Sequence, residues 1–134
     1  MGDEAGRYAA TEEVADLAKG VGKYGGLYVS HMRDEGAGLL DSVRETLHIG
    51  EVSGCGVEIS HHKTVGSDNW GQVTHSLAMI EEAVAKGHDA TADQYPYTAR
   101  STMLFALVQN GTCGAGDRKS VVEGRSVELG GRRS

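Results

Sequence analysis

Segments with helical periodicity alternate with short apolar, strand-like segments along most of this 134-residue chain. One helix and one strand together occupy about 30 residues, which is the size of a βα unit. Strict alternation with short loops favours a parallel sheet with right-handed crossover connections, so the predicted fold class is α/β. The predicted helices span 11–24, 39–52 and 72–86, and the predicted strands span 27–31, 57–61 and 89–94.

Local signals set the ends and faces of these helices. Thr11 is predicted to be the N-cap of the first helix, because its hydroxyl can accept a bond from an unpaired backbone N–H. Glycines follow each helix and are expected to end it. The residues expected on the inward faces of the second and third helices are Leu40, Val43, Leu47, Ile49, Leu77, Ile80 and Val84.

The alternating pattern is typical of two architectures, an eight-fold βα barrel and an open doubly wound sheet. Periodicity alone does not separate them. No GxGxxG motif follows a predicted strand, so the sequence gives no support to a dinucleotide-binding domain.

Composition narrows the classes of partner. The net charge is −6, and binding to phosphates needs a basic face, so no nucleic-acid partner is expected. No membrane span is expected, because the chain has no apolar run of about 18 residues. No signal-peptide core follows the acidic start, which predicts a cytoplasmic protein. Cys55 and Cys113 form no motif and are expected to remain reduced thiols.

The segment 117–134 differs in character from the rest of the chain. It is rich in Arg, Ser and Gly and shows no amphipathic period. It resembles the translation of a sequencing adapter, and we expect it to be a non-native or disordered tail rather than part of a domain. A natural, flexible basic tail is the alternative.

Two histidines, His31 and His61, end the first two predicted strands in the matching contexts Val-Ser-His and Ile-Ser-His. In parallel α/β folds, functional side chains project from the carboxyl ends of strands. Adjacent strands lie about 4.8 Å apart, and a histidine nitrogen binds zinc at about 2.0–2.1 Å, so the two imidazoles can share one metal ion. The alternative is that each is a hydrogen-bonded structural histidine.

The other histidines fit a metal site less well. His48 and His75 lie in predicted helices and His88 lies in a turn, where solvated side chains are expected. His62 follows His61 directly, so its side chain is predicted to point away from that of His61.

Four motifs in order resemble the N-acyl-D-amino-acid deacylases, with the D-aminoacylase branch of the amidohydrolase superfamily as the best match. The resemblance covers about residues 8–110. It implies that 1–116 is part of a metal-dependent (β/α)8 TIM barrel, with the three strands as its strands five to seven. The motifs are YGGLYVSHMRDEG (24–36), ISHHK (59–63), NWG (69–71) and ADQYPY (92–97).

The same resemblance implies roles for individual residues. His31 and His61 correspond to metal ligands for Zn²⁺, and Lys63, Tyr95 and Ser101 correspond to groups that hold the carboxylate of an N-acyl-D-amino acid. An ammonium and two hydroxyls can all donate to a carboxylate. The alternative for Lys63 is a solvated loop lysine, for Tyr95 an aromatic residue packed by Pro96, and for Ser101 a helix cap. The charged loop 33–35 is interpreted as a solvated turn.

The family's His-x-His pair of strand one, its cysteine ligand of strand four and its catalytic aspartate of strand eight have no counterpart here. No catalytic residue is therefore assigned, and the chain is expected to be a fragment that is inactive alone. The implied activity is hydrolysis of the amide bond of N-acyl-D-amino acids. The alternatives are a cyclic-amide hydrolase of the hydantoinase or dihydroorotase type and a non-catalytic α/β domain.

Overall fold

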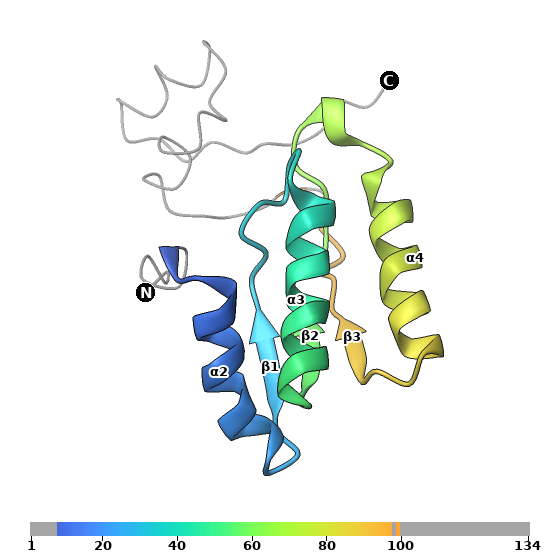
Figure 1. Ribbon diagram of the computed structural model, residues 1–134. Helices are drawn as coiled ribbons and strands as arrows, with labels where there is room; N and C mark the ends of the chain where they lie inside the picture. The colour runs from blue at the N-terminus through green and yellow to red at the C-terminus, as the bar shows by residue number, and fades with distance from the viewer. Residues whose placement is uncertain (1–7, 98, 100–134) are drawn as a thin grey trace. The chain divides into compact units, whose positions relative to one another are not determined.

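The computed structural model describes residues 8–97 and residue 99. The chain divides into two units, Met1–Gln94 and Tyr95–Ser134, and the fold described below is that of the first. Helices and strands alternate as the sequence predicts (Figure 1). The elements are α2 (Thr11–Gly22), β1 (Leu27–Ser30), α3 (Leu39–Ser53), β2 (Gly56–Ile59), the 3-10 helix η1 (Ser67–Asn69), α4 (Gln72–Ala85) and β3 (Ala90–Ala92).

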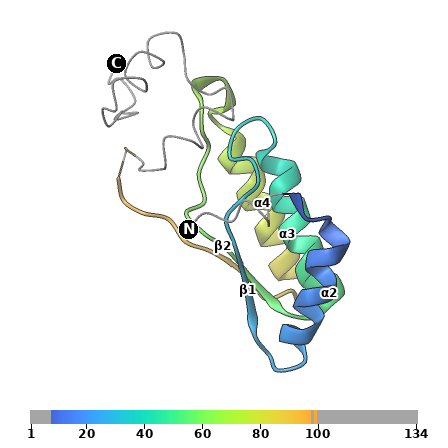
Figure 2. The same ribbon diagram turned by 90° about the vertical axis from the view of Figure 1, so that its left-hand side faces the viewer.

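The three strands form a parallel sheet in the order β1-β2-β3. Val29 is level with Glu58 of the central strand, which in turn is level with Thr91. Figure 2 shows the helices of this unit gathered on one face of the sheet. The predicted α/β class and the parallel arrangement are confirmed.

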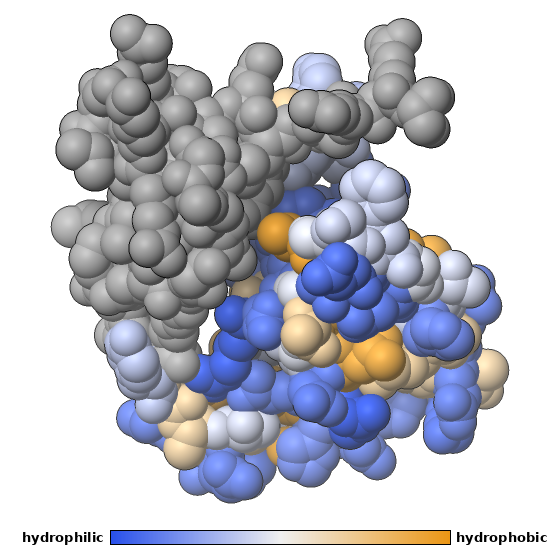
Figure 3. All heavy atoms as spheres, turned by 90° about the horizontal axis from the view of Figure 1, so that it is seen from above, coloured by the Kyte–Doolittle hydropathy of each residue, from blue (hydrophilic) through white to orange (hydrophobic). Residues whose placement is uncertain are grey.

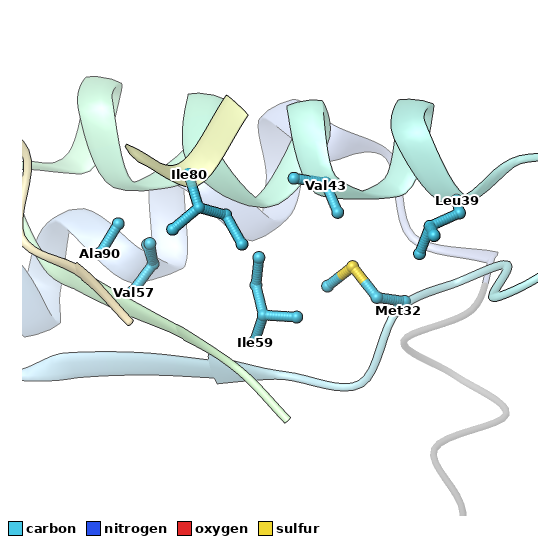
Figure 4. Close-up of a cluster of buried hydrophobic side chains, with 7 residues drawn as sticks. All are labelled: Met32, Leu39, Val43, Val57, Ile59, Ile80 and Ala90. Atoms are coloured by element: carbon cyan, nitrogen blue, oxygen red, sulfur yellow. The ribbon is translucent and has the colours of Figure 1, made fainter. Parts of the chain in front are cut away.

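The main hydrophobic core lies between the sheet and the helices (Figure 4). Successive side chains of a strand point to opposite faces, so alternate residues of β2 enter this layer. Val57 and Ile59 are 2% and 0% exposed. The core cluster comprises Met32, Leu39, Val43, Val57, Ile59, Ile80 and Ala90.

The other face of the sheet is uncovered within the part of the chain that the structure describes. Leu27 and Val29 of β1 alternate with Tyr28, which packs against the core. The exposed fractions of Leu27 and Val29 are 45% and 54%. Glu58 and Thr91 lie level with Val29 on the same face, so its exposed apolar side chains are those of β1, and side chains of this kind are buried by a covering layer in a folded domain.

The helix faces differ in part from the prediction. Val43 and Ile49 are buried and Ile80 is 7% exposed, as expected. Leu77 and Val84 were expected to point inward, and this is wrong, because they are 42% and 49% exposed. Instead, the small side chain of Ser76 lies on the buried side of α4, at 0% exposure.

The N-cap prediction for Thr11 is also wrong. Ala10 occupies the N-cap position of α2, and no side chain caps that end. Thr11 is the first helical residue, and its hydroxyl donates a hydrogen bond to Oε1 of Glu45 in α3 at 2.6 Å. A tertiary partner has therefore replaced the local cap.

Several sequence predictions fall on residues that lie outside the described part of the chain. These are the tail 117–134, Cys113 and Ser101. Cys55 is a buried free thiol with its Sγ 2.9 Å from Oγ of Ser53. Among the described residues, no helix is both long and apolar enough to cross a membrane.

Candidate metal centre

His31 and His61 meet at the carboxyl edge of the sheet, as the sequence predicts. The strands end slightly earlier than expected, so His31 follows β1 directly and His61 stands two residues beyond β2. Nδ1 of His31 lies 2.5 Å from Nε2 of His61, and the rings stack with centroids 4.6 Å apart. The two nitrogens therefore converge on one point.

The backbone of His61 adopts an unusual conformation that re-aims its side chain. Its φ is +42°, the only positive value among the described non-glycine residues. Its N–H donates to Oδ1 of Asp93 at 2.6 Å, just beyond the neighbouring strand β3. A residue held in the left-handed region costs free energy unless its surroundings fix it, and such positions cluster at functional sites.

Glu35 and Lys63 complete the arrangement around His61. Oε1 of Glu35 is 2.9 Å from Nδ1 of His61 and 2.6 Å from Nζ of Lys63. Lys63 also lies 2.9 Å from Nδ1 of His61 and donates to its carbonyl oxygen at 3.1 Å. The Lys63 side chain is only 19% exposed, so the alternative of a solvated loop lysine does not hold.

The interpretation of 33–35 as a solvated turn is wrong. Arg33 forms an ion pair with Glu45 of α3 at 2.7 Å. Asp34 accepts hydrogen bonds from the backbone N–H groups of Gly36 and Gly38, which shapes the loop. The signal that the sequence contained was the opposite charge of Glu35 and Lys63 on loops after adjacent strands, which meet at one edge of a parallel sheet.

His62 points away from His61, as predicted, and serves the fold. It is 5% exposed, and its Nε2 lies 2.8 Å from Oγ of Ser76 in α4. Burial lowers the pKa of His62, and the nearby charge of Lys63 lowers it further against the opposing effect of Glu35. His62 is therefore a neutral, hydrogen-bonded core residue. The predictions for His48 and His75 are confirmed, because both are exposed, whereas His88 is half-buried.

The residues predicted to hold a substrate carboxylate are not all placed together. Lys63 stands beside His61. Tyr95 belongs to the second unit of the chain, where the centroid of its ring lies 6.5 Å from that of Tyr97. Ser101 lies outside the described residues.

Seen from above, toward the carboxyl ends of the strands, the described surface is largely hydrophilic (Figure 3). Within residues 8–97 and 99, no group of three or more His, Cys, Asp or Glu side chains could hold a metal ion. The described site therefore supplies two candidate ligands, and a catalytic zinc ion normally takes three from the protein.

The two histidines fit a zinc ion in ligand type and in the closeness of their nitrogens. Tetrahedral zinc would hold two ligand nitrogens about 3.3 Å apart, given zinc–nitrogen bonds of about 2.05 Å. The distance between these nitrogens is 2.5 Å, so the rings would separate by less than an ångström (roughly 0.8 Å on the same geometry). In addition, Nδ1 of His61 contacts a carboxylate, the outer partner that metal-bound histidines commonly have.

Comparisons with known proteins agree with the motifs. The D-aminoacylase of Alcaligenes xylosoxydans is 43% identical over 96 residues, which are 72% of this chain and 20% of that protein. The N-acyl-D-glutamate deacylase of the same organism is 39% identical over 100 residues, 75% of this chain and 20% of that protein. No family model matches the chain.

A solved structure gives the same result for the fold. The N-acyl-D-glutamate deacylase from Bordetella bronchiseptica, in complex with zinc and a phosphonate inhibitor, matches with a TM-score of 0.73 and 37% identity. The match covers 75% of this chain and 21% of that one, so the chain spans about one fifth of the length of these relatives. The resemblance indicated by the motifs is confirmed: the matched residues are related to one segment of the D-aminoacylases and other N-acyl-D-amino-acid deacylases.

Proposed function

We propose that this chain is a segment of a zinc-dependent hydrolase that cleaves the amide bond of N-acyl-D-amino acids. The observation that carries the proposal is the convergence of Nδ1 of His31 and Nε2 of His61, 2.5 Å apart, at the ends of adjacent parallel strands. The names of the relatives supply the reaction class. The zinc complex of the related deacylase supports the choice of metal.

The proposed architecture is three βα units of a (β/α)8 barrel, corresponding to its strands five to seven. In such a barrel the helices form the outer layer and the inner face of the sheet is covered by other strands. The helices on one face here, and the exposed Leu27 and Val29 on the other, support this arrangement. Active sites of these barrels lie at the carboxyl ends of the strands, where His31 and His61 stand.

In the proposed mechanism His31 and His61 each offer one ring nitrogen to the metal. If zinc were bound by these two nitrogens, the chemistry it would supply is a water acidified near neutral pH and polarisation of the scissile carbonyl. Glu35 orients the ring of His61 through Nδ1. No described residue is assigned the transfer of a proton to the leaving amine, which requires an acid or base positioned at that nitrogen.

The substrate carboxylate is proposed to bind to Lys63, Tyr95 and Ser101. Lys63 is held beside His61 by Glu35 rather than extending into solvent, so its ammonium is preorganised next to the metal ligands. An ordered donor loses less conformational entropy on binding than a mobile lysine does. The proposed role of the Tyr95 and Ser101 hydroxyls is inferred from the family motif alone.

The experiment places this segment in a complete barrel. Residues 8–97 replace the matching segment of the D-aminoacylase of Alcaligenes xylosoxydans, and zinc content and hydrolysis are measured on the purified chimera. We expect stoichiometric zinc and release of free D-amino acids from N-acetyl-D-amino acids with neutral or acidic side chains. The L-enantiomers and a hydantoin serve as comparison substrates, because hydrolysis of the hydantoin would favour a cyclic-amide hydrolase.

Variants of the chimera test the two ligands. His31→Ala and His61→Ala are each expected to lose zinc and turnover together, whereas His75→Ala, at an exposed helical position, is expected to keep both. If the large graft does not fold, a graft of 24–36 and 59–63 alone carries the same residues. A folded chimera that retains zinc and activity after either ligand is removed would contradict the proposal.

A further inference from the structure

Glu35 lies in the loop after β1 but acts on the end of β2. Its Oε1 is 2.9 Å from Nδ1 of His61 and 2.6 Å from Nζ of Lys63, and its side chain is 14% exposed. Its backbone carbonyl accepts a hydrogen bond from N of Val65 at 2.7 Å, which joins the loops that follow the two strands. This hydrogen bond holds the backbone of Glu35 against the loop that carries Lys63.

Two groups of opposite character compete for Nδ1 of His61. Lys63 Nζ and Glu35 Oε1 both lie 2.9 Å from this nitrogen. An ammonium can only donate, so a bond from Lys63 would use the lone pair of Nδ1 and leave the ring proton on Nε2. A carboxylate can only accept, so a bond to Glu35 places the proton on Nδ1 and leaves a lone pair on Nε2.

The difference matters because Nε2 is the nitrogen that faces His31. A protonated Nε2 cannot bind a metal ion. Lys63 also brings a positive charge to the ring of a proposed metal ligand, and Glu35, whose Oε1 is 2.6 Å from Nζ, compensates that charge. The Lys63 ammonium has two other acceptors close by, Glu35 Oε1 and the carbonyl oxygen of His61.

We propose that Glu35 is a positioning residue that selects the metal-binding tautomer of His61 and keeps the ammonium of Lys63 off Nδ1. This inference rests on the proposed function, in which His61 binds zinc through Nε2. Carboxylates that accept the outer N–H of a metal-bound histidine fix its orientation, and their loss typically weakens metal binding about tenfold to hundredfold.

The first measurement needs no metal. Histidine-selective ¹⁵N labelling of the 134-residue chain, followed by long-range ¹H–¹⁵N correlation spectra, reports which ring nitrogen carries the proton. We expect the proton of His61 on Nδ1 in the unmodified chain and on Nε2 in Glu35→Ala. A His61 proton that remains on Nδ1 in Glu35→Ala overturns the proposal.

The second measurement is the zinc dissociation constant of the chimeric barrel, determined by competition with a chelator. We expect Glu35→Ala to bind zinc about tenfold to hundredfold more weakly, and Glu35→Ala with Lys63→Met to recover part of the loss because the competing donor is gone. Glu35→Gln keeps the volume and one acceptor but not the charge, so an intermediate loss is expected. If Glu35→Ala does not fold, Glu35→Gln replaces it in this measurement.

Glu45→Gln is the matched control. Glu45 is similarly buried, at 18% side-chain exposure, and pairs with Arg33 rather than with His61, so its loss should leave zinc affinity unchanged. Unchanged affinity in Glu35→Ala, or a double variant as weak as Glu35→Ala, contradicts the role of Glu35. A chimera that binds no zinc before any substitution contradicts the proposed function instead, and the tautomer measurement still decides the role of Glu35.

Discussion

Adjacent histidines do different work at the end of β2. The side chain of His61 lies among His31, Glu35 and Lys63, whereas that of His62 is buried against Ser76 of α4. The strand period of two predicts this division from the sequence, because neighbouring residues face opposite sides. What the period does not predict is the positive φ of His61, which accompanies the hydrogen bond from its N–H to Asp93, just beyond β3.

Removal of the Ser76 hydroxyl tests the structural role of His62. Ser76 Oγ donates to the carbonyl of Val73 at 3.1 Å and is hydrogen-bonded to Nε2 of His62 at 2.8 Å. Ser76→Ala leaves that buried ring nitrogen without this partner, and we expect a loss of about 1–3 kcal/mol in the free energy of unfolding. Urea unfolding followed by circular dichroism measures it. Ser67→Ala, at an exposed serine, is the control and should change little.

At the scale of elements, periodicity and glycine positions predict α2, α3, α4 and the three strands to within a few residues, whereas the 3-10 helix η1 was not predicted. Gly54 ends α3 in the left-handed conformation at φ +70°, as expected of a glycine that follows a helix. Gly50 plays a different part. A Cβ there would lie 2.5 Å from Cγ1 of the buried Val57, so this glycine lets α3 approach β2 closely.

Alanine substitutions at two helical glycines separate packing from propensity. Gly50→Ala is expected to lower stability, because overpacking costs about 1–3 kcal/mol and exceeds a gain in helix propensity of about 1 kcal/mol. Gly20→Ala in α2 has no atom within 4 Å of the added Cβ, so the propensity gain should stabilise it. The unfolding midpoints of both variants measure these changes in stability. A stabilised Gly50→Ala would contradict the close contact between α3 and Val57.

At the scale of the whole molecule, the described sheet has two edge strands, β1 and β3, and on its uncovered face the apolar side chains of Leu27 and Val29 are exposed. Unpaired strand edges and exposed apolar faces promote association between chains. The isolated 134-residue chain is therefore expected to self-associate and to show no deacylase turnover, whereas in the proposed barrel other strands would cover this face.

Val29→Lys tests which environment this face belongs to. In the isolated chain the added charge should reduce self-association, as measured by light scattering. In the proposed barrel the same position would lie in the packed interior, so the lysine is expected to lower the unfolding temperature of the chimera. Tyr24→Lys, at a side chain that is 91% exposed, is the control and should be tolerated in both. A chimera of unchanged stability would argue against the barrel arrangement.

Sequence by itself determined the α/β alternation, the parallel orientation of the strands, the convergence of His31 and His61 and the relationship to the deacylases. These follow from local periodicity, from the rule that parallel strands end at one edge, and from motifs read in order. Only the tertiary structure decided that Glu35 belongs to the site and that Leu77 faces outward. A charged loop residue looks the same in sequence whether its side chain contacts solvent or a histidine from another strand. The spacing of apolar residues along a helix likewise does not show which of them the neighbouring elements cover.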